Sequence, residues 1–134
     1  MNSYPKNYPE SCPPSDAQDA NGDYYRLVHE NPPSENDLLS NAELGLKPKA
    51  DECLRLGLSV YGTEQGASAT YLHFKNLYGE GVRLGALVAK GSLSPKDGKT
   101  KQTFKPPHET WWPYEDVDRG SLFTVVKDMS DVES

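Results

Sequence analysis

The sequence lacks the motifs that mark the common nucleotide-binding and hydrolytic sites. It contains no glycine-rich phosphate loop, no nucleophile elbow and no pair of histidines at the spacing of zinc ligands. The glycines of "YGEGVRLG" lie between an expected helix and an expected strand, so they indicate a helix end and a turn. The common nucleotide-binding motifs are therefore excluded.

Positive charge and long apolar runs are also scarce. No apolar stretch approaches the roughly 20 residues that cross a bilayer, and the N-terminal "MNSYPKNYPESCPPSD" has no apolar region of a secretory signal. The 134 residues carry a formal net charge of -6, which repels nucleic-acid phosphates and anionic lipids. We therefore expect a soluble, cytoplasmic protein that binds neither nucleic acid nor membrane.

Cysteine is represented by two residues in unlike contexts. Cys12 lies among prolines, whereas Cys53 lies in the amphipathic stretch "ADECLRLG". Neither has another Cys or His nearby at ligand spacing, so we expect no metal site. In the absence of a secretory signal, a reduced, buried Cys53 and an incidental Cys12 are favoured over a disulfide.

The remaining patterns predict one small α+β domain between two tails. Residues 1–23 are polar and rich in proline, so we expect them to be disordered or draped over the surface, and residues 128–134 form an acidic tail. Residues 24–127 predict a mixed sheet, which could be split in two, with two or three helices. Strands are expected at 24–29, 58–62, 81–91 and 119–128, and helices at 34–44, 48–56 and 63–78.

Lysines and prolines crowd residues 90–107 around the turn sequence "SPKDG". A mobile basic loop of this kind could meet an anion such as a nucleotide phosphate. Because lysine is usually exposed, a solvated hairpin is the favoured interpretation.

Polar side chains within the first two expected strands are candidates for chemistry. Strand alternation places Arg26 and His29 on opposite faces, so at most one of them belongs to a site. Ser59 and Tyr61 are two residues apart and share a face, where a hydroxyl and a phenol suit a planar ligand. The alternative is that Tyr61 is a core residue with its hydroxyl at the rim.

The stretch "PPHETWWPYED" combines two tryptophans with titratable groups. Such a composition is typical of a ligand pocket or a binding edge, and makes Trp111 and Trp112 candidates for contact with a cofactor. The prolines equally allow an extended segment that one tryptophan pins to the sheet. A carboxylate beside these rings, Glu109 or Glu115, could have a raised pKa and act as an acid if it is buried.

Three of these stretches together resemble small bacterial proteins related to the RES-domain toxins and, more distantly, the ADP-ribosyltransferase fold. They are "YYRLVH" as a first strand with Arg26, "LSVYGT" as a second strand, and the later polar-aromatic segment. In that fold NAD lies across a cleft between two half-sheets. The resemblance therefore implies NAD as a substrate.

The resemblance also implies roles for single residues. Arg26 or His29 would contact the ribose or a phosphate, Ser59 and Tyr61 would support the nicotinamide end, and a late glutamate would act on the ribose. A carboxylate bonded to the ribose stabilises an oxocarbenium-like transition state as nicotinamide leaves. The glutamate would be Glu109 or Glu115. The glycine-tryptophan-asparagine run of the RES family is missing, and "NPPSENDLLSN" stands in its place.

Two functions from different classes follow. The first is an NAD-consuming enzyme, either a glycohydrolase or an ADP-ribosyltransferase, which would act as a toxin with an antitoxin or a target protein as its partner. The second is a non-catalytic interaction module that binds a protein through residues 108–116. A sensor that binds a small ligand in the same cleft differs from the first only in lacking turnover.

Overall fold

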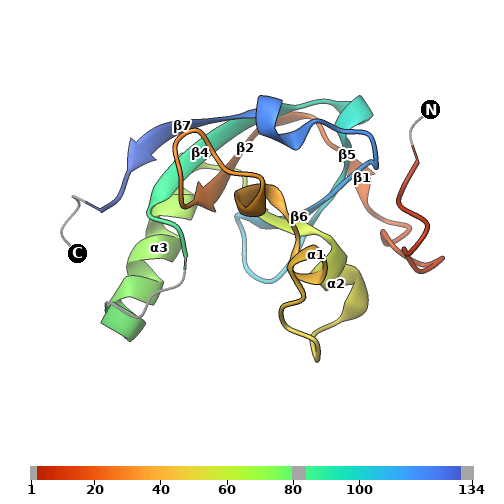
Figure 1. Cartoon of the computed structure of the whole chain (residues 1–134), viewed down its shortest axis with the longest axis horizontal. Helices are drawn as coiled ribbons and strands as arrows, with labels where there is room; N and C mark the ends of the chain where they lie inside the picture. Colours follow the sequence, from red (N-terminus) through yellow and green to blue (C-terminus); the bar gives the residue numbers. More distant parts are fainter. Residues whose placement is uncertain (1–2, 80–83, 131–134) are drawn as a thin grey trace.

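In the computed structural model, which describes residues 3–79 and 84–130, seven strands pair into one curved sheet (Figure 1). The strand order is β1-β5-β6-β3-β2-β4-β7, and all neighbouring strands are antiparallel. The strands are β1 (Gln18–Asp19), β2 (Gly22–Val28), β3 (Leu58–Tyr61), β4 (Leu87–Leu93), β5 (Gly98–Gln102), β6 (His108–Pro113) and β7 (Phe123–Asp128).

The predicted small α+β domain is confirmed, but the prediction of a mixed sheet is wrong. A strand, helix, strand order can give parallel neighbours when the two strands lie side by side. Here the helix after β3 carries the chain past β2, so β3 and β4 lie on either side of β2. Both strands pair with β2 in the antiparallel direction.

The helices are α1 (Asn41–Leu44), α2 (Glu52–Leu56) and α3 (Glu64–Tyr78), and the 3-10 turns are η1 (Asn36–Leu38), η3 (Pro95–Asp97) and η4 (Arg119–Ser121). The predicted main helix is confirmed, and it begins where the Thr63 hydroxyl accepts a hydrogen bond from the Gly66 amide. Across the described residues, none of these helices combines the length and the apolar character that a membrane span requires.

The helix expected at 34–44 is interrupted. Ser34 and Asp37 bond each other's backbone amides through their side chains and close the turn η1. The chain then becomes extended at Leu39, and Ser40 starts α1 as its N-cap in a capping box with Glu43. The turn closed by Ser34 and Asp37 and the N-cap at Ser40 therefore divide the predicted helix into η1 and α1.

Apolar side chains alternate along the strands and build a core on each face of the sheet. On one face, Tyr24, Val28, Val60 and Trp111 are buried together with Leu38 of η1. On the opposite face, the buried residues of α3 pack against the strands. This second core contains Tyr61, Val88, Ala67, Tyr71 and Met129.

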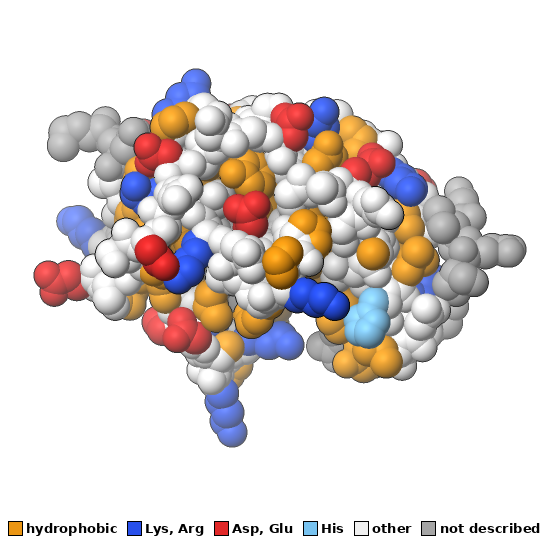
Figure 2. Space-filling view, turned by 180° about the vertical axis from the view of Figure 1, so that it is seen from behind, with side chains coloured by type: hydrophobic (Ala, Val, Ile, Leu, Met, Phe, Trp, Pro, Cys, Tyr) orange, Lys and Arg blue, Asp and Glu red, His pale blue; other side chains and the backbone are white. Residues whose placement is uncertain are grey.

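The helices cover two separate parts of one side of the sheet. Figure 1 shows α3 and the α1–α2 pair at opposite ends beneath the sheet, with the loop between β5 and β6 between them. From behind, the outline is notched at its lower edge, beside the end that α3 occupies (Figure 2).

The segment before β2 is packed against the domain, so disorder at 3–21 is not observed. Cys12 and Ala17 are buried beside Leu56 and Trp112, and the Tyr4 hydroxyl donates to the Trp112 carbonyl at 3.1 Å. The draped alternative is the one that fits. The aromatic rings supply the burial that the polar composition conceals, and they shift the domain boundary to well before residue 24.

The C-terminal boundary also shifts. Met129 is 1% exposed and its amide donates to the carbonyl of Ala86, so the domain continues past residue 127. Residues 131–134 of the expected acidic tail lie outside the described residues, as do 1–2 and 80–83.

The expectation of reduced cysteines is wrong, because Cys12 and Cys53 form a disulfide across 41 residues of sequence. The bond ties the N-terminal segment to α2, where both cysteines pack near Trp112. The prediction rested on the absence of a secretory signal, which does not report whether the two cysteines lie close together in the fold.

The lysine-rich segment is a connection between the two halves of the sheet rather than a solvated hairpin. The predicted turn "SPKDG" is present as η3, but the strands that flank it, β4 and β5, are not neighbours. Lys99 and Lys101 of β5 pair with Asp19 and Asp16 at 3.2 and 2.8 Å. The N-terminal segment thus supplies carboxylates to the lysines that could have met an anion.

Candidate functional site

The three sequence stretches that carry the family resemblance lie on adjacent strands. "YYRLVH" forms most of β2, "LSVY" forms β3 and "HETWWP" forms β6, and the sheet order places them side by side as β6-β3-β2. The pairing of β2 with β3 rests on one residue pair, Tyr25 with Tyr61, whereas β2 and β4 share seven. The sheet is thus continuous but weakly joined at this position.

Arg26 provides the connection that the backbone does not make at this junction. Its Nε donates to the Asp37 carbonyl at 2.9 Å and its Nη1 donates to the Ser59 carbonyl at 2.7 Å. Burial lowers the pKa of Arg26 to about 10, against the favourable charge of Asp37. The guanidinium therefore stays positively charged at neutral pH and lies against the backbone of β3.

His29 lies just beyond β2 and is connected to the turn η1. Its Nδ1 is 2.9 Å from Asp37 Oδ1, and its side chain is 64% exposed. Burial opposes the charge of Asp37, but hydrogen bonds from His29, Ser34 and Glu30 outweigh it and hold the pKa of Asp37 below its ordinary value. His29 and Arg26 thus both contact the turn η1, and Arg26 also reaches β3.

Ser59 is the exposed residue of β3, and its hydroxyl begins a chain of hydrogen bonds on the helical face. Ser59 Oγ is 3.0 Å from His108 Nε2. On the far side of the ring, His108 Nδ1 is 2.9 Å from Thr103 Oγ1 and 3.2 Å from the Thr103 carbonyl. Thr103 Oγ1 is in turn 2.8 Å from Thr110 Oγ1. One imidazole therefore connects β3 to the loop between β5 and β6.

Two aromatic rings flank this imidazole. Tyr61, opposite His108 in the strand register, meets it edge to face with ring centroids 5.4 Å apart, and Phe104 does so at 5.1 Å. Tyr61 is buried against α3, and this burial raises the pKa of its phenol, so the phenol is neutral at pH 7. Phe104 is 76% exposed and has a φ of 57°, a strained conformation for a residue with a side chain.

The loop that carries Phe104 is fixed by the first turn of α3. A Cβ on Gly66 would collide with the ring of Pro107, so only glycine lets the helix approach this closely. The Gly62 amide also donates to the Pro107 carbonyl at 3.0 Å. The end of β3 and the start of α3 together hold the loop in place.

The two candidate glutamates lie away from the Ser59 hydroxyl. Glu109 alternates with His108 on β6 and so lies on the opposite face of the sheet, with Trp111. Burial raises its pKa, against a hydrogen bond with Thr100. Glu109 lines a groove of about 450 Å³ beside β5. Glu115 follows β6, is exposed, and its amide donates to the Ser3 carbonyl at 2.8 Å.

Both tryptophans are core residues. Trp111 and Trp112 are 0% exposed and lie in different clusters, one beneath each face of the sheet. Their indole N–H groups donate to the carbonyls of Asp97 and Cys53 at 3.0 and 2.9 Å. In this state neither ring can contact a cofactor or a protein partner, and the pinning interpretation of the segment fits the structure.

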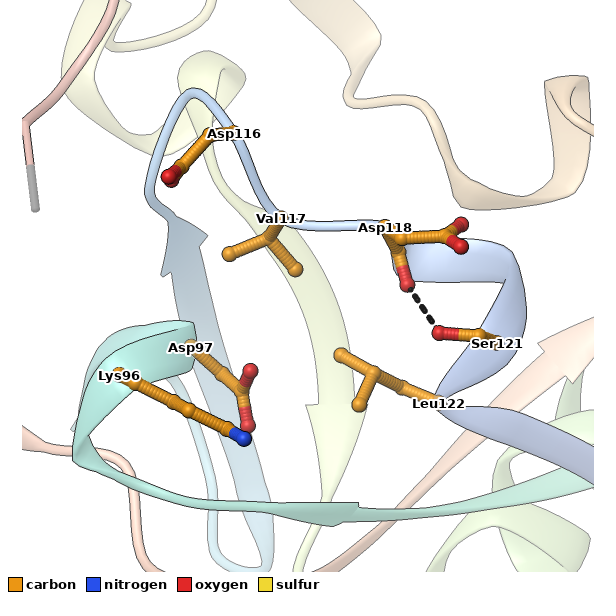
Figure 3. Close-up of a pocket in the computed structure, with 7 residues that line it drawn as sticks. All are labelled: Lys96, Asp97, Asp116, Val117, Asp118, Ser121 and Leu122. Atoms are coloured by element: carbon orange, nitrogen blue, oxygen red, sulfur yellow. Dashed lines mark hydrogen bonds between the residues drawn. The ribbon is translucent and has the colours of Figure 1, made fainter.

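A separate pocket of about 330 Å³ lies between η3 and the segment before β7 (Figure 3). The carboxylate of Asp97 is already bonded by the amide and hydroxyl of Ser94 at 2.8 and 3.2 Å. Among the residues that the structure describes, no group of three or more Asp, Glu, His or Cys side chains is placed to hold a metal ion. The pocket is lined by Lys96, Asp97, Asp116, Val117, Asp118, Ser121 and Leu122.

Comparison with protein-family models, curated proteins and solved structures gives no significant match. Of the predicted set, the structure places Ser59 and Tyr61 on one face with His108, which the sequence suggested only as part of an interaction segment. Arg26 lies on the other face and reaches the Ser59 carbonyl. The alternation of His108, Thr110 and Trp112 along one strand face was the signal that could have separated His108 from Glu109.

Proposed function

We propose that the protein is an NAD-consuming enzyme, an NAD glycohydrolase or an ADP-ribosyltransferase, with its site at the junction of β2, β3 and β6. The observation that carries the proposal is the strand order. Arg26 and Ser59 lie on strands far apart in the sequence, yet the Arg26 guanidinium is 2.7 Å from the Ser59 carbonyl. The resemblance proposes that its first and second strands are neighbours in this way, although the Arg26 side chain reaches Ser59 at its backbone carbonyl.

The chemistry of these residues supports NAD as the substrate. A guanidinium has five N–H donors and is suited to phosphate and ribose oxygens. Two of the Arg26 donors hold backbone carbonyls, which fixes the position of the charge. Ser59 is exposed and its hydroxyl bonds to His108, whose ring also contacts Phe104. The exposed ring of Phe104 offers a stacking surface for a planar base.

The roles first predicted for the other residues have less support. Glu109 lies on the opposite face from Ser59, and Glu115 lies beyond the end of β6. The alternative of a protein-binding module depended on exposed tryptophans, and both rings are buried. Neither tryptophan is thus exposed for a protein partner to contact.

The test is incubation of the purified full-length chain with NAD, followed by proton NMR. Release of free nicotinamide together with ADP-ribose supports a glycohydrolase. Release that needs an added acceptor protein, with ADP-ribose transferred to that protein, supports a transferase. If neither nicotinamide nor a modified acceptor forms, the proposal is wrong.

The proposal also includes a role as a toxin. A toxin that depletes NAD or modifies a target would need a neutralising protein or a target protein as its partner. The cytoplasmic location predicted from the sequence stays a prediction, and the disulfide between Cys12 and Cys53 favours an oxidising compartment instead.

A further inference from the structure

We infer that His108 is the acid–base residue of this site and takes the place that a glutamate holds in the family resemblance. This inference rests on the proposed function, because it assigns the group that accepts a proton during NAD cleavage. It also rests on geometry of its own: His108 is the titratable side chain within hydrogen-bond distance of Ser59 Oγ, at 3.0 Å.

The contacts of the ring define its tautomer. A carbonyl oxygen can only accept, so the 3.2 Å contact of His108 Nδ1 with the Thr103 carbonyl places the proton on Nδ1. In the neutral ring Nε2 then carries a lone pair and accepts a hydrogen bond from the Ser59 hydroxyl. Thr103 thus acts as a positioning residue that directs the basic nitrogen toward the Ser59 hydroxyl.

The surroundings keep the imidazole neutral. Burial lowers the pKa of His108, and the bond to the Thr103 carbonyl only partly opposes this. Its titratable or charged neighbours include Tyr61, whose ring centroid is 5.4 Å away, and Lys105, whose carbonyl accepts from the His108 amide at 3.0 Å. Arg26 and Glu109 lie on the other face. Because no carboxylate shares the face of His108 on β3 or β6, its proton affinity is not raised by a negative neighbour there.

The step that follows balances without a further reactant beyond NAD and water, or an acceptor hydroxyl. The bond between ribose C1′ and the pyridinium nitrogen breaks, its electron pair goes to nicotinamide, and neutral nicotinamide leaves. The oxygen of water bonds to C1′ while its proton passes to His108 Nε2, either directly or through the Ser59 hydroxyl. The imidazolium then returns the proton to solvent. Arg26 lies on the other face of the sheet and reaches Ser59 at its carbonyl, so it fixes the β3 backbone at this position.

The experiment compares the wild-type chain with His108→Gln and with His73→Gln, a control at an exposed histidine of α3. We expect His108→Gln to lower kcat for nicotinamide release roughly 100-fold or more, the usual contribution of a general base. The KM for NAD and the thermal midpoint should change little, and His73→Gln should behave as wild type. An active wild type with His108→Gln within threefold of its kcat would overturn the inference.

A second measurement needs no variant. Nitrogen-15 NMR of the wild-type imidazole rings reports the tautomer and pKa of His108, and we expect a neutral ring with the proton on Nδ1 and a pKa below 6.5, the ordinary value for histidine. A proton on Nε2 at neutral pH would overturn the inference. If the wild type releases no nicotinamide, the proposed function fails and the base role fails with it. If only the variant or tautomer result disagrees, the proposed function survives and this assignment alone is wrong.

Discussion

Ser59 Oγ and His108 Nε2 lie 3.0 Å apart although 49 residues separate them in the sequence. The pairing of β3 with β6 sets this distance, because Ser59 lies opposite Thr110 and Tyr61 lies opposite His108 in the register. Arg26 reaches the same stretch of β3 from the other side. The site is thus a property of three neighbouring strands and the loop that precedes β6.

Removal of the Ser59 hydroxyl should affect activity more than stability. Ser59 is exposed, so we expect Ser59→Ala to change the free energy of unfolding by less than about 0.5 kcal/mol. Loss of one hydrogen bond to substrate or base should lower kcat/KM for NAD about tenfold. Ser92→Ala, at an exposed serine of β4 bonded to Asp23, is the matched control and should keep full activity. Equal activity of the two variants would contradict the placement of the site.

Arg26→Lys should destabilise the junction between β2 and β3. Lysine keeps the charge but cannot hold the carbonyls of Asp37 and Ser59 together with one planar group. We expect a loss of about 1.5–3 kcal/mol in urea unfolding, the size of one hydrogen bond to a charged group. Lys101→Gln, which removes a surface ion pair with Asp16, should cost less than about 1 kcal/mol. Equal losses would mean that Arg26 is an ordinary surface residue.

Much of the fold was predictable from the sequence because local patterns decide it. Thr63 and Gly57 mark real helix ends, and the apolar alternation in "LSVY" and "LFTVV" marks real strands. The strand order was not predictable in the same way. It depends on α3 passing over β2, and neighbouring sequence does not contain that information.

The candidate site was predictable only in part. Arg26, Ser59 and Tyr61 followed from composition and alternation, together with the family resemblance. His108 was missed because its role depends on the register between β3 and β6 and on the contact of its Nδ1 with Thr103, which are tertiary features. The burial of Trp111 and Trp112 could not be deduced because a proline-rich stretch gives no sign of lying at the centre of a sheet.

The disulfide should contribute to stability through the N-terminal segment. Reduction, or replacement of Cys12 and Cys53 by serine, should lower the free energy of unfolding by about 2–4 kcal/mol. Thiol titration of the oxidised chain in denaturant should find no free cysteine, and Tyr4 should become more accessible after reduction. Two reactive thiols in protein isolated without reductant would contradict the bond.

Glu109 should make stability depend on pH in a defined direction. Its folded-state pKa is raised by burial, so its carboxylate is less favourable in the folded protein than in the unfolded chain. The contribution of protonated Glu109 to the free energy of unfolding is fully present below the ordinary glutamate pKa. This contribution is lost as the pH rises through the folded-state pKa. We therefore expect Glu109→Gln to be more stable than wild type at pH 7, with the difference vanishing as the pH falls below the ordinary glutamate pKa.

Glu115→Gln provides the control for that measurement, because Glu115 is exposed. The free energy of unfolding of the Glu115→Gln variant should equal that of wild type both at pH 7 and below the ordinary glutamate pKa. A Glu109→Gln variant that is less stable than wild type at pH 7 would show that the carboxylate stabilises the fold and would reverse the expected sign.

The central claim, that NAD binds where β2, β3 and β6 meet, is tested most directly by amide chemical shifts. A carbocyclic NAD analogue that resists cleavage would be titrated into nitrogen-15-labelled protein. The largest shifts are predicted at Ser59, Phe104 and His108, with little change at Asp116 and Asp118 of the separate pocket. Absence of saturable shifts, or shifts centred on that pocket, would contradict the account.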